Sequence, residues 1–202
     1  MAEGRSRRRV SLELVRDEAH YDVVVAGAIA QARTSVWIST ANLKDVHVEA
    51  PVGTRARARG RYVSALELFG DLARRGVDIR ILHGGEPSRP FQESLRRAGG
   101  PAKIGMALRR CPRVHLKMIA VDGAFLYLGS ANFTGAGIGA KSAVRRNFEA
   151  GVATDDELLL DEMQGVFDRI WTGGACAGCS VRRLCPGPLD VARPARAPTR
   201  SR

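Results

Sequence analysis

Apolar and polar positions alternate along the first half of the chain in a way that predicts helices followed by short strands. Apolar residues recur at helical spacing over His20–Arg33, and Ser35–Ser39 has the pattern of a short strand. A second helix and strand are predicted at Tyr62–Arg75 and Val77–Leu82, separated by Gly76, which suits a helix end. This order predicts an α/β fold with a mixed or parallel sheet flanked by helices.

The second half of the chain adds a hairpin to this pattern. The dipeptide Asp122-Gly123 tolerates positive φ and therefore suits a tight turn between two strands. The unit is not repeated, so we expect one lobe per chain. The predicted elements are a helix at Pro87–Ala98, strands at Val114–Val121, Ala124–Leu128 and Asn147–Ala153, and a helix at Asp155–Trp171.

Composition changes this picture mainly at the two ends. Arginines in residues 1–9, and prolines with arginines in residues 188–202, predict a disordered basic arm and tail around a domain at 10–172 and a cysteine-rich element at 173–187. A chain of 202 residues has room for one well-buried domain but not for a second catalytic lobe. Since no signal core or membrane-spanning stretch is found, we expect a cytoplasmic protein.

The net charge of the chain points to a polyanionic partner. The formal charge is +11, which favours nucleic acid or anionic lipid over a merely solvated basic surface. Residues 44–61 predict a basic loop that fits either a phosphate-contacting flap or a mobile solvated loop equally well. Its arginines are Arg55, Arg57, Arg59 and Arg61.

A set of polar residues surrounds the predicted hairpin with fixed spacing. On a strand, His115 and Lys117 share a face and therefore a site, whereas the odd offset of Asp122 places it at the turn, where it braces the structure. Together with Gly129, Ser130 and Asn132 they form the string His-x-Lys-x4-Asp-x6-Gly-Ser-x-Asn.

The second part of this string predicts a phosphate cradle. Gly129 allows close backbone approach, and the hydroxyl of Ser130 and the amide of Asn132 can donate to phosphate oxygens. The ammonium of Lys117 would stabilise negative charge in the transition state without a metal, so no cofactor is expected for catalysis.

The string resembles the signature of the phospholipase D superfamily, and its chance occurrence in such a chain is on the order of one in a million. The resemblance covers Tyr21 to Trp171 and implies a mixed sheet with helices on both faces. In this family two motifs face each other: one histidine forms a phosphohistidine and the other protonates the leaving group. Because this chain carries one motif, the resemblance implies a homodimer, like the compact endonuclease-type members, in which His115 of both subunits completes one site.

The segment Asn147-Phe148-Glu149 lies where those compact members carry an Asn-x-Glu element. The resemblance implies that Glu149 orients the catalytic histidine, since a carboxylate bonded to imidazole fixes its tautomer. The alternative is a carboxylate at a strand end that pairs with Arg145 or Arg146.

The cysteines lie outside the resemblance. They predict a structural Zn²⁺ or iron–sulfur site that clips the C-terminus to the core, and the alternative is free thiols in a frayed tail. The isolated His47 and His83 are interpreted as structural. The four cysteines are Cys111, Cys176, Cys179 and Cys185.

These observations lead to one main hypothesis and two alternatives. The main hypothesis is a metal-independent phosphodiesterase, a homodimeric nuclease that cleaves DNA or RNA through His115. The first alternative is a phospholipid hydrolase or phosphatidyltransferase, which the same motif supports. The second is a non-catalytic nucleic-acid-binding subunit of a larger defence or repair complex.

Overall fold

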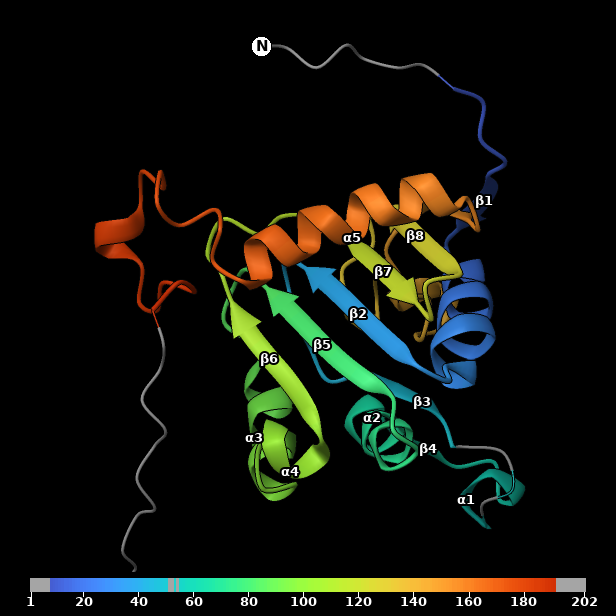
Figure 1. Cartoon of the computed structure of the whole chain (residues 1–202). Coiled ribbons are helices and arrows are strands. Elements are labelled where there is room, and N and C mark those ends of the chain that lie inside the picture. The colour runs from blue at the N-terminus through green and yellow to red at the C-terminus, as the bar shows by residue number, and fades with distance from the viewer. Residues whose placement is uncertain (1–7, 51–52, 54, 192–202) are drawn as a thin grey trace, which may run out of the picture.

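The computed structural model describes residues 8–50, 53 and 55–191, and most of the predicted arm and tail, at 1–7 and 192–202, lies outside them. A seven-stranded mixed sheet forms the centre of the described chain, in the order β1-β9-β8-β7-β2-β5-β6 (Figure 1). Its strands are β1 (Glu13–Arg16), β2 (Ser35–Thr40), β5 (Asp78–His83), β6 (Met106–Arg110), β7 (Met118–Val121), β8 (Phe125–Gly129) and β9 (Ala150–Thr154).

The sheet has a parallel and an antiparallel half. Strands β2, β5 and β6 are parallel, and β7, β8, β9 and β1 continue the sheet in antiparallel pairs from the other side of β2. Helices connect the parallel strands: α2 (Ala65–Arg74) precedes β5, and α3 (Arg89–Arg97) with α4 (Pro101–Ile104) precedes β6. The long helix α5 (Glu157–Trp171) follows β9 and crosses the opposite face of the sheet (Figure 1).

Side chains of β2 divide between two cores because successive residues of a strand point to opposite faces. Val36 and Ile38 are fully buried in the core that α2 and α3 cover. Trp37 points to the other face and stacks on Phe167 of α5, with ring centroids 5.3 Å apart. Helices therefore cover both faces of the sheet, which confirms the predicted α/β fold class.

The described parts of the basic segment 44–61 contain regular elements that were not expected from the sequence. It contains β3 (His47–Glu49) and α1 (Arg55–Ala58), and β3 pairs with β4 (Tyr62–Ser64). Val48 is buried and anchors this small sheet to the main core. The predicted helix at Tyr62–Arg75 therefore begins only at Ala65.

The start of α2 and the first helical segment show why local patterns misplace boundaries. The hydroxyl of Ser64 accepts a hydrogen bond from the Leu66 N–H and caps α2. The predicted helix at His20–Arg33 is a π-helix, η1 (His20–Ala28), followed by a 3₁₀ turn, η2 (Ile29–Gln31). Both types of turn share the apolar periodicity of an α-helix closely enough that sequence alone does not separate them.

Four further boundaries differ from the expected ones. Strand β7 begins at Met118, so residues 114–117 precede the strand, and β9 begins at Ala150. Helix α3 starts after its cap, Ser88, and α5 starts after Asp156, whose carboxylate accepts the Leu159 N–H. Strands β1 and β6 were not expected, because each is a short edge strand that pairing with a distant segment defines.

Parts of the predicted terminal segments pack against the domain. Arg8, from the predicted arm, pairs with Asp156 at the start of α5. Leu189, from the predicted tail, packs against the core beneath α5, and its neighbour Asp190 pairs with Arg182 at 2.5 Å. No helix within the described ranges is long and apolar enough to cross a membrane.

Candidate active site

The ends of three adjacent strands bring the residues of the motif together. Because β7, β8 and β9 are antiparallel neighbours, the start of β7, the end of β8 and the start of β9 lie side by side. The Gly129 N–H donates to the Lys117 carbonyl at 3.3 Å, and the Ser130 N–H donates to the Ala150 carbonyl at 3.0 Å. The sheet therefore joins His115–Lys117, Gly129–Ser130 and Glu149 into one site.

His115 and Lys117 are in direct contact, although both precede the strand that was expected to carry them. The Lys117 Nζ lies 3.0 Å from Nδ1 and 3.2 Å from Nε2 of His115, and it donates to the His115 carbonyl at 2.9 Å. Burial lowers the pKa of Lys117, and the nearby Glu149 carboxylate opposes this shift. His115 is exposed and Lys117 half-buried, so the pair faces the open surface.

Glu149 lies in the same site, but its contacts differ from those that the resemblance implies. The Ser130 hydroxyl donates to its carboxylate, and the Asn147 amide donates to the other oxygen at 3.0 Å. The Ala150 N–H in turn donates to the Ser130 hydroxyl at 3.1 Å. In the described part of the chain, Glu149 thus orients Ser130 and makes no hydrogen bond to His115. Arg146 pairs with Glu18 at 3.0 Å and not with Glu149.

Asn132 is tied to the end of β2, a contact that the sequence did not reveal. Its Oδ1 accepts the Asn42 N–H at 3.0 Å and the Thr40 hydroxyl at 3.3 Å. These bonds fix the amide with its oxygen toward β2, which leaves the NH₂ group as the end that can donate to a ligand. The only signal for Thr40 and Asn42 is their position at the carboxyl end of a parallel strand, where sites in open sheets gather.

Asp122 occupies the turn between β7 and β8, as its offset predicted. Its φ is 56°, and its carboxylate accepts the N–H groups of Arg33 at 2.8 Å, Thr34 at 2.7 Å and Ser35 at 2.9 Å. Partial burial by itself would raise the pKa of Asp122, but these bonds and that from the Thr34 hydroxyl outweigh burial and lower the pKa. Asp122 therefore fastens the far end of the hairpin to the start of β2.

A buried pair beneath the site was also missed. The Tyr127 hydroxyl lies 2.8 Å from Nε2 of His20, and Nδ1 of His20 lies 2.9 Å from the Asp17 carbonyl. A carbonyl only accepts, so Nδ1 of His20 donates to it. Burial raises the pKa of Tyr127 to about 12.

The Tyr127 hydroxyl explains why glycine is needed at the start of the phosphate cradle. A Cβ at Gly129 would lie 2.2 Å from that hydroxyl, and one at Gly151 would lie 2.6 Å from it. The ring thus lies on one face of the sheet against the backbones of Gly129 and Gly151, just before Ser130.

Comparisons with known proteins agree with this geometry. The family model described as the PLD-like domain of cardiolipin synthase matches residues 25–171. The chain belongs to the phospholipase D superfamily. Members of the superfamily act on phosphodiester bonds, so phosphodiester chemistry is supported at that level. A search of curated proteins finds no match.

Solved structures resemble this superfamily member over most of its length. NucT from Helicobacter pylori is 16% identical with a TM-score of 0.53, covering 80% of this chain and 95% of its own. Nuc from Salmonella typhimurium, described as a phospholipase D family member, is 20% identical with a TM-score of 0.53, covering 81% and 95%. Phosphatidylserine synthase from Haemophilus influenzae is 12% identical with a TM-score of 0.51, covering 92% of this chain but 40% of its own. At these identities the likeness shows the fold.

The cysteines of this phospholipase D superfamily member gather around a cavity outside the motif. All four line a cavity of about 150 Å³ between the end of β6 and the C-terminal segment. Among the described residues, no three His, Cys, Asp or Glu side chains are already arranged around one metal position. Of the isolated histidines, His83 is buried with its Nδ1 2.8 Å from the Gly85 carbonyl, and burial lowers its pKa, whereas His47 is exposed on β3.

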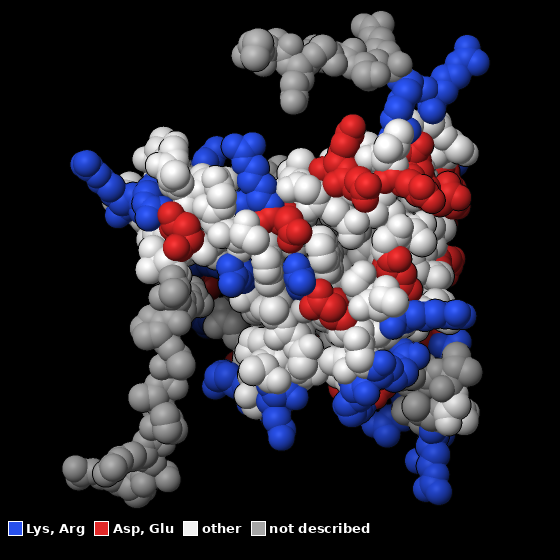
Figure 2. Space-filling view, in the orientation of Figure 1, with Lys and Arg blue, Asp and Glu red and all other residues white. Residues whose placement is uncertain are grey.

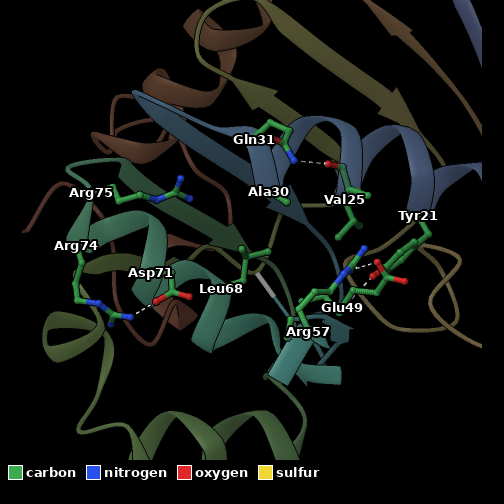
Figure 3. A pocket seen from close by; sticks show the side chains of 13 residues that line it. Tyr21, Val25, Ala30, Gln31, Glu49, Arg57, Leu68, Asp71, Arg74 and Arg75 are labelled. Atoms are coloured by element: carbon green, nitrogen blue, oxygen red, sulfur yellow. Dashed lines mark hydrogen bonds and ion pairs between the residues drawn. The ribbon is translucent and has the colours of Figure 1, made fainter. Parts of the chain in front are cut away.

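A cavity of about 510 Å³ lies beside η1, β3 and α2 (Figure 3). Arg57 pairs with Glu49 and Arg74 with Asp71 on its walls. Gln31, another lining residue, precedes the N-terminal end of β2, whereas the motif lies at the other end of that strand, roughly 20 Å away. This cavity and helix α1, which carries Arg55 and Arg57, therefore lie away from the motif (Figure 1). The start of the basic segment lies beside the motif, where the Lys44 N–H donates to the Phe133 carbonyl at 3.1 Å.

Proposed function

We propose that the chain is a phosphodiesterase that cleaves nucleic acid through His115, in a site shared by two copies of the chain. The observation that carries the proposal is the contact of His115 with Lys117 at the exposed ends of β7 and β8, next to the Ser130 hydroxyl. One imidazole suffices for a nucleophile but not for a simultaneous proton donor. A second copy that faces these strand ends would supply that donor.

The proposed reaction proceeds in two displacements. An imidazole nitrogen of His115 attacks phosphorus and forms a P–N bond, while the bond to the leaving oxygen breaks and this oxygen takes a proton from His115 of the second copy. That second histidine, now neutral, removes a proton from water. The water oxygen attacks phosphorus, the P–N bond breaks, and a phosphomonoester is released with both histidines restored.

Charge on the nonbridging oxygens would be stabilised by groups of this chain. The Lys117 ammonium supplies a positive charge, and the NH₂ group of Asn132 is held in place by its bonds to β2. The Ser130 hydroxyl, which now donates to Glu149, would rotate to donate to a bound phosphate. Glu149 would keep its hydrogen bond from the Asn147 amide and so hold the β9 side of the site in place.

Nucleic acid is favoured as the substrate by charge and by an aromatic side chain at the site. The net charge of +11 suits a phosphate backbone. Phe148, between Asn147 and Glu149, is 99% exposed, and the exposed Lys141 and Arg145 precede it in the chain. Unpaired bases stack on exposed aromatic rings, and cationic residues in the same loop suit the phosphates of a single strand.

The test is incubation of the purified chain with labelled single-stranded DNA, double-stranded DNA and RNA in EDTA. We expect cleavage by the wild type and a loss of about 1,000-fold or more in His115→Ala, since the nucleophile is removed. His47→Ala, which changes an exposed histidine on β3, should cleave normally. Equal cleavage by wild type and His115→Ala would overturn the proposal. Circular dichroism shows whether each variant is folded.

Lipid is the second candidate substrate, because the matching family model and one solved neighbour carry names of phospholipid enzymes. Vesicles of phosphatidylglycerol or phosphatidylcholine provide the test. Headgroup release that depends on His115, without cleavage of nucleic acid, would replace the nuclease with a phospholipid hydrolase or phosphatidyltransferase. Salt-sensitive binding of nucleic acid without any turnover would instead indicate a binding subunit of a larger assembly.

A further inference from the structure

The cysteines converge although one of them is far away in the chain. Cys111 follows β6, whereas Cys176, Cys179 and Cys185 follow α5, and all four are half-buried free thiols that line the same cavity. They are all the cysteines of the chain. The fold thus brings every thiol of the chain to one place outside the motif.

Successive turns hold the C-terminal segment, residues 173–191, around this cavity. The Cys176 N–H donates to the Gly173 carbonyl at 2.9 Å, and the Cys179 N–H donates to the Cys176 carbonyl at 3.1 Å. Gly173 has a φ of 84°, and a Cβ there would lie 2.3 Å from the Asp190 nitrogen, so the segment closes on itself.

This C-terminal segment contains little that would stabilise it without help. Its one helical element is the 3₁₀ turn η4 (Arg182–Leu184), and Leu184 is 87% exposed. Leu189 is the residue of the segment that packs against the core beneath α5. Segments with so small a core usually depend on a disulfide or a metal.

The charges around the cavity suit a thiolate cluster. Arg110, Arg113 and Arg182 line it together with the cysteines. Arg113 donates a hydrogen bond to the Cys179 sulfur. Four thiolates around a divalent cation carry a net charge of about −2, which nearby guanidinium groups would offset.

We propose that Cys111, Cys176, Cys179 and Cys185 bind one Zn²⁺ ion and that the metal holds the C-terminal segment against the end of β6. Four sulfur ligands around Zn²⁺ are tetrahedral, with Zn–S distances of about 2.3 Å. The thiols line the cavity without yet meeting at one point, so binding requires their side chains to turn into it.

The position of Cys111 links this site to the motif. The Val114 N–H donates to the Cys111 carbonyl at 2.9 Å, and a Cβ at Gly84 would lie 2.3 Å from the Val114 carbonyl. The chain between Cys111 and His115 is thus held between β5 and the metal site. The catalytic importance of this link to His115 rests on the proposed function, whereas metal binding does not.

The test is elemental analysis of the full chain purified without chelator, followed by titration of reduced, metal-free protein with ZnCl₂. We expect one equivalent of zinc, a cobalt derivative with the visible bands of a tetrahedral thiolate site, and at least a tenfold weaker affinity in Cys111→Ser and Cys179→Ser. His47→Ala should bind zinc as the wild type does. Nuclease activity does not enter these readouts, so the two proposals can fail separately.

Limited trypsin digestion tests the role of the metal in the wild-type chain, where no substitution disturbs folding. We expect cleavage at Arg182 and Arg183 to become at least tenfold faster after chelation and to slow again when Zn²⁺ is returned. No zinc uptake by the reduced chain, or undiminished uptake by Cys111→Ser, would overturn the proposal. So would iron with inorganic sulfide at the cysteines, or disulfides whose reduction restores no zinc binding.

Discussion

At the scale of single residues, His115 and Lys117 share a site without the strand geometry that was expected to align them. The expectation used the alternation of side chains on a strand, but β7 begins only at Met118. The segment before it belongs to no helix or strand, yet it places the Lys117 Nζ 3.0 Å from Nδ1 of His115. The Lys117 ammonium is therefore close to the imidazole on which the proposed chemistry depends.

The lowered pKa of Lys117 predicts the alkaline limb of activity. Burial favours the neutral amine, so Lys117 loses its charge at a pH below the ordinary lysine pKa of 10.5. We expect the proposed activity to fall with that charge. In Lys117→Arg the guanidinium stays charged, and we expect the alkaline limb to move to higher pH even if the maximal rate falls. A pH–rate profile checks this, with Lys141→Arg as the control that leaves the limb in place.

Phe148 predicts a preference for unpaired bases. Phe148→Ala should weaken binding of single-stranded DNA by about 1 to 3 kcal/mol, because a stacking platform is lost. Its stability should not change, since the ring is 99% exposed. Fluorescence anisotropy measures the affinity, and Leu184→Ala removes another exposed apolar side chain as the control. Equal affinities for wild type and Phe148→Ala would remove the ring from the binding surface.

At the scale of elements, the hairpin of β7 and β8 is fastened at both ends. At one end Asp122 accepts three backbone N–H groups from residues 33–35, and at the other the Tyr127 hydroxyl supports the backbone at Gly129. The dipeptide Asp122-Gly123 indicated the turn from sequence. The length of the strands and the partners of Asp122 depend on β2, which lies beside β7 only in the folded sheet.

Asp122→Asn tests this attachment. We expect the free energy of unfolding to fall by about 1 to 3 kcal/mol near neutral pH, because hydrogen bonds to a charged acceptor are lost. The folded-state pKa of Asp122 is below its unfolded value, so its contribution is complete above the unfolded pKa and is lost as pH falls through the folded pKa. Acid destabilisation should therefore be shallower in Asp122→Asn than in wild type, and unchanged in Asp161→Asn, an exposed acid on α5. Urea unfolding at a series of pH values measures both.

At the scale of the whole molecule, the open position of the motif is the main consequence of the fold. His115, Ser130 and Phe148 are exposed, and Val144, in the loop before Phe148, is 92% exposed. Charge is unevenly spread: acidic side chains gather over the end of α5 nearest β8, and basic ones around α1 and the C-terminal segment (Figure 2). A second copy docked at the exposed ends of β7 and β8 would cover the motif together with Val144 and Phe148.

Subunit mixing tests the shared site. If two His115 side chains are required, exchange of wild type with an equal amount of His115→Ala should reduce activity to about half of its value before exchange, because only wild-type pairs are active. Light scattering should give the mass of a dimer throughout. Activity that does not change on mixing, or a monomeric mass for an active protein, would show that each chain works alone.

The sequence by itself determined the alternation of helices and strands, the turn at Asp122-Gly123 and the residues of the motif. These features depend on local periodicity and fixed spacing, which can be recognised without knowing the distant contacts. It did not reveal β1 and β6, whose pairing partners are distant, or the π-helical form of η1.

Only the tertiary structure decided which groups meet. Asn132 is hydrogen-bonded to the end of β2, and Ser130 and Asn147 both donate to Glu149. His20 contacts Tyr127, and Cys111 lies with the other cysteines around one cavity. The physical reason is that sheet order and helix packing set these contacts between segments far apart in the chain, and no local pattern records them. The motif indicated the chemistry from the sequence alone, and the order of the strands placed its residues at the exposed ends of β7, β8 and β9.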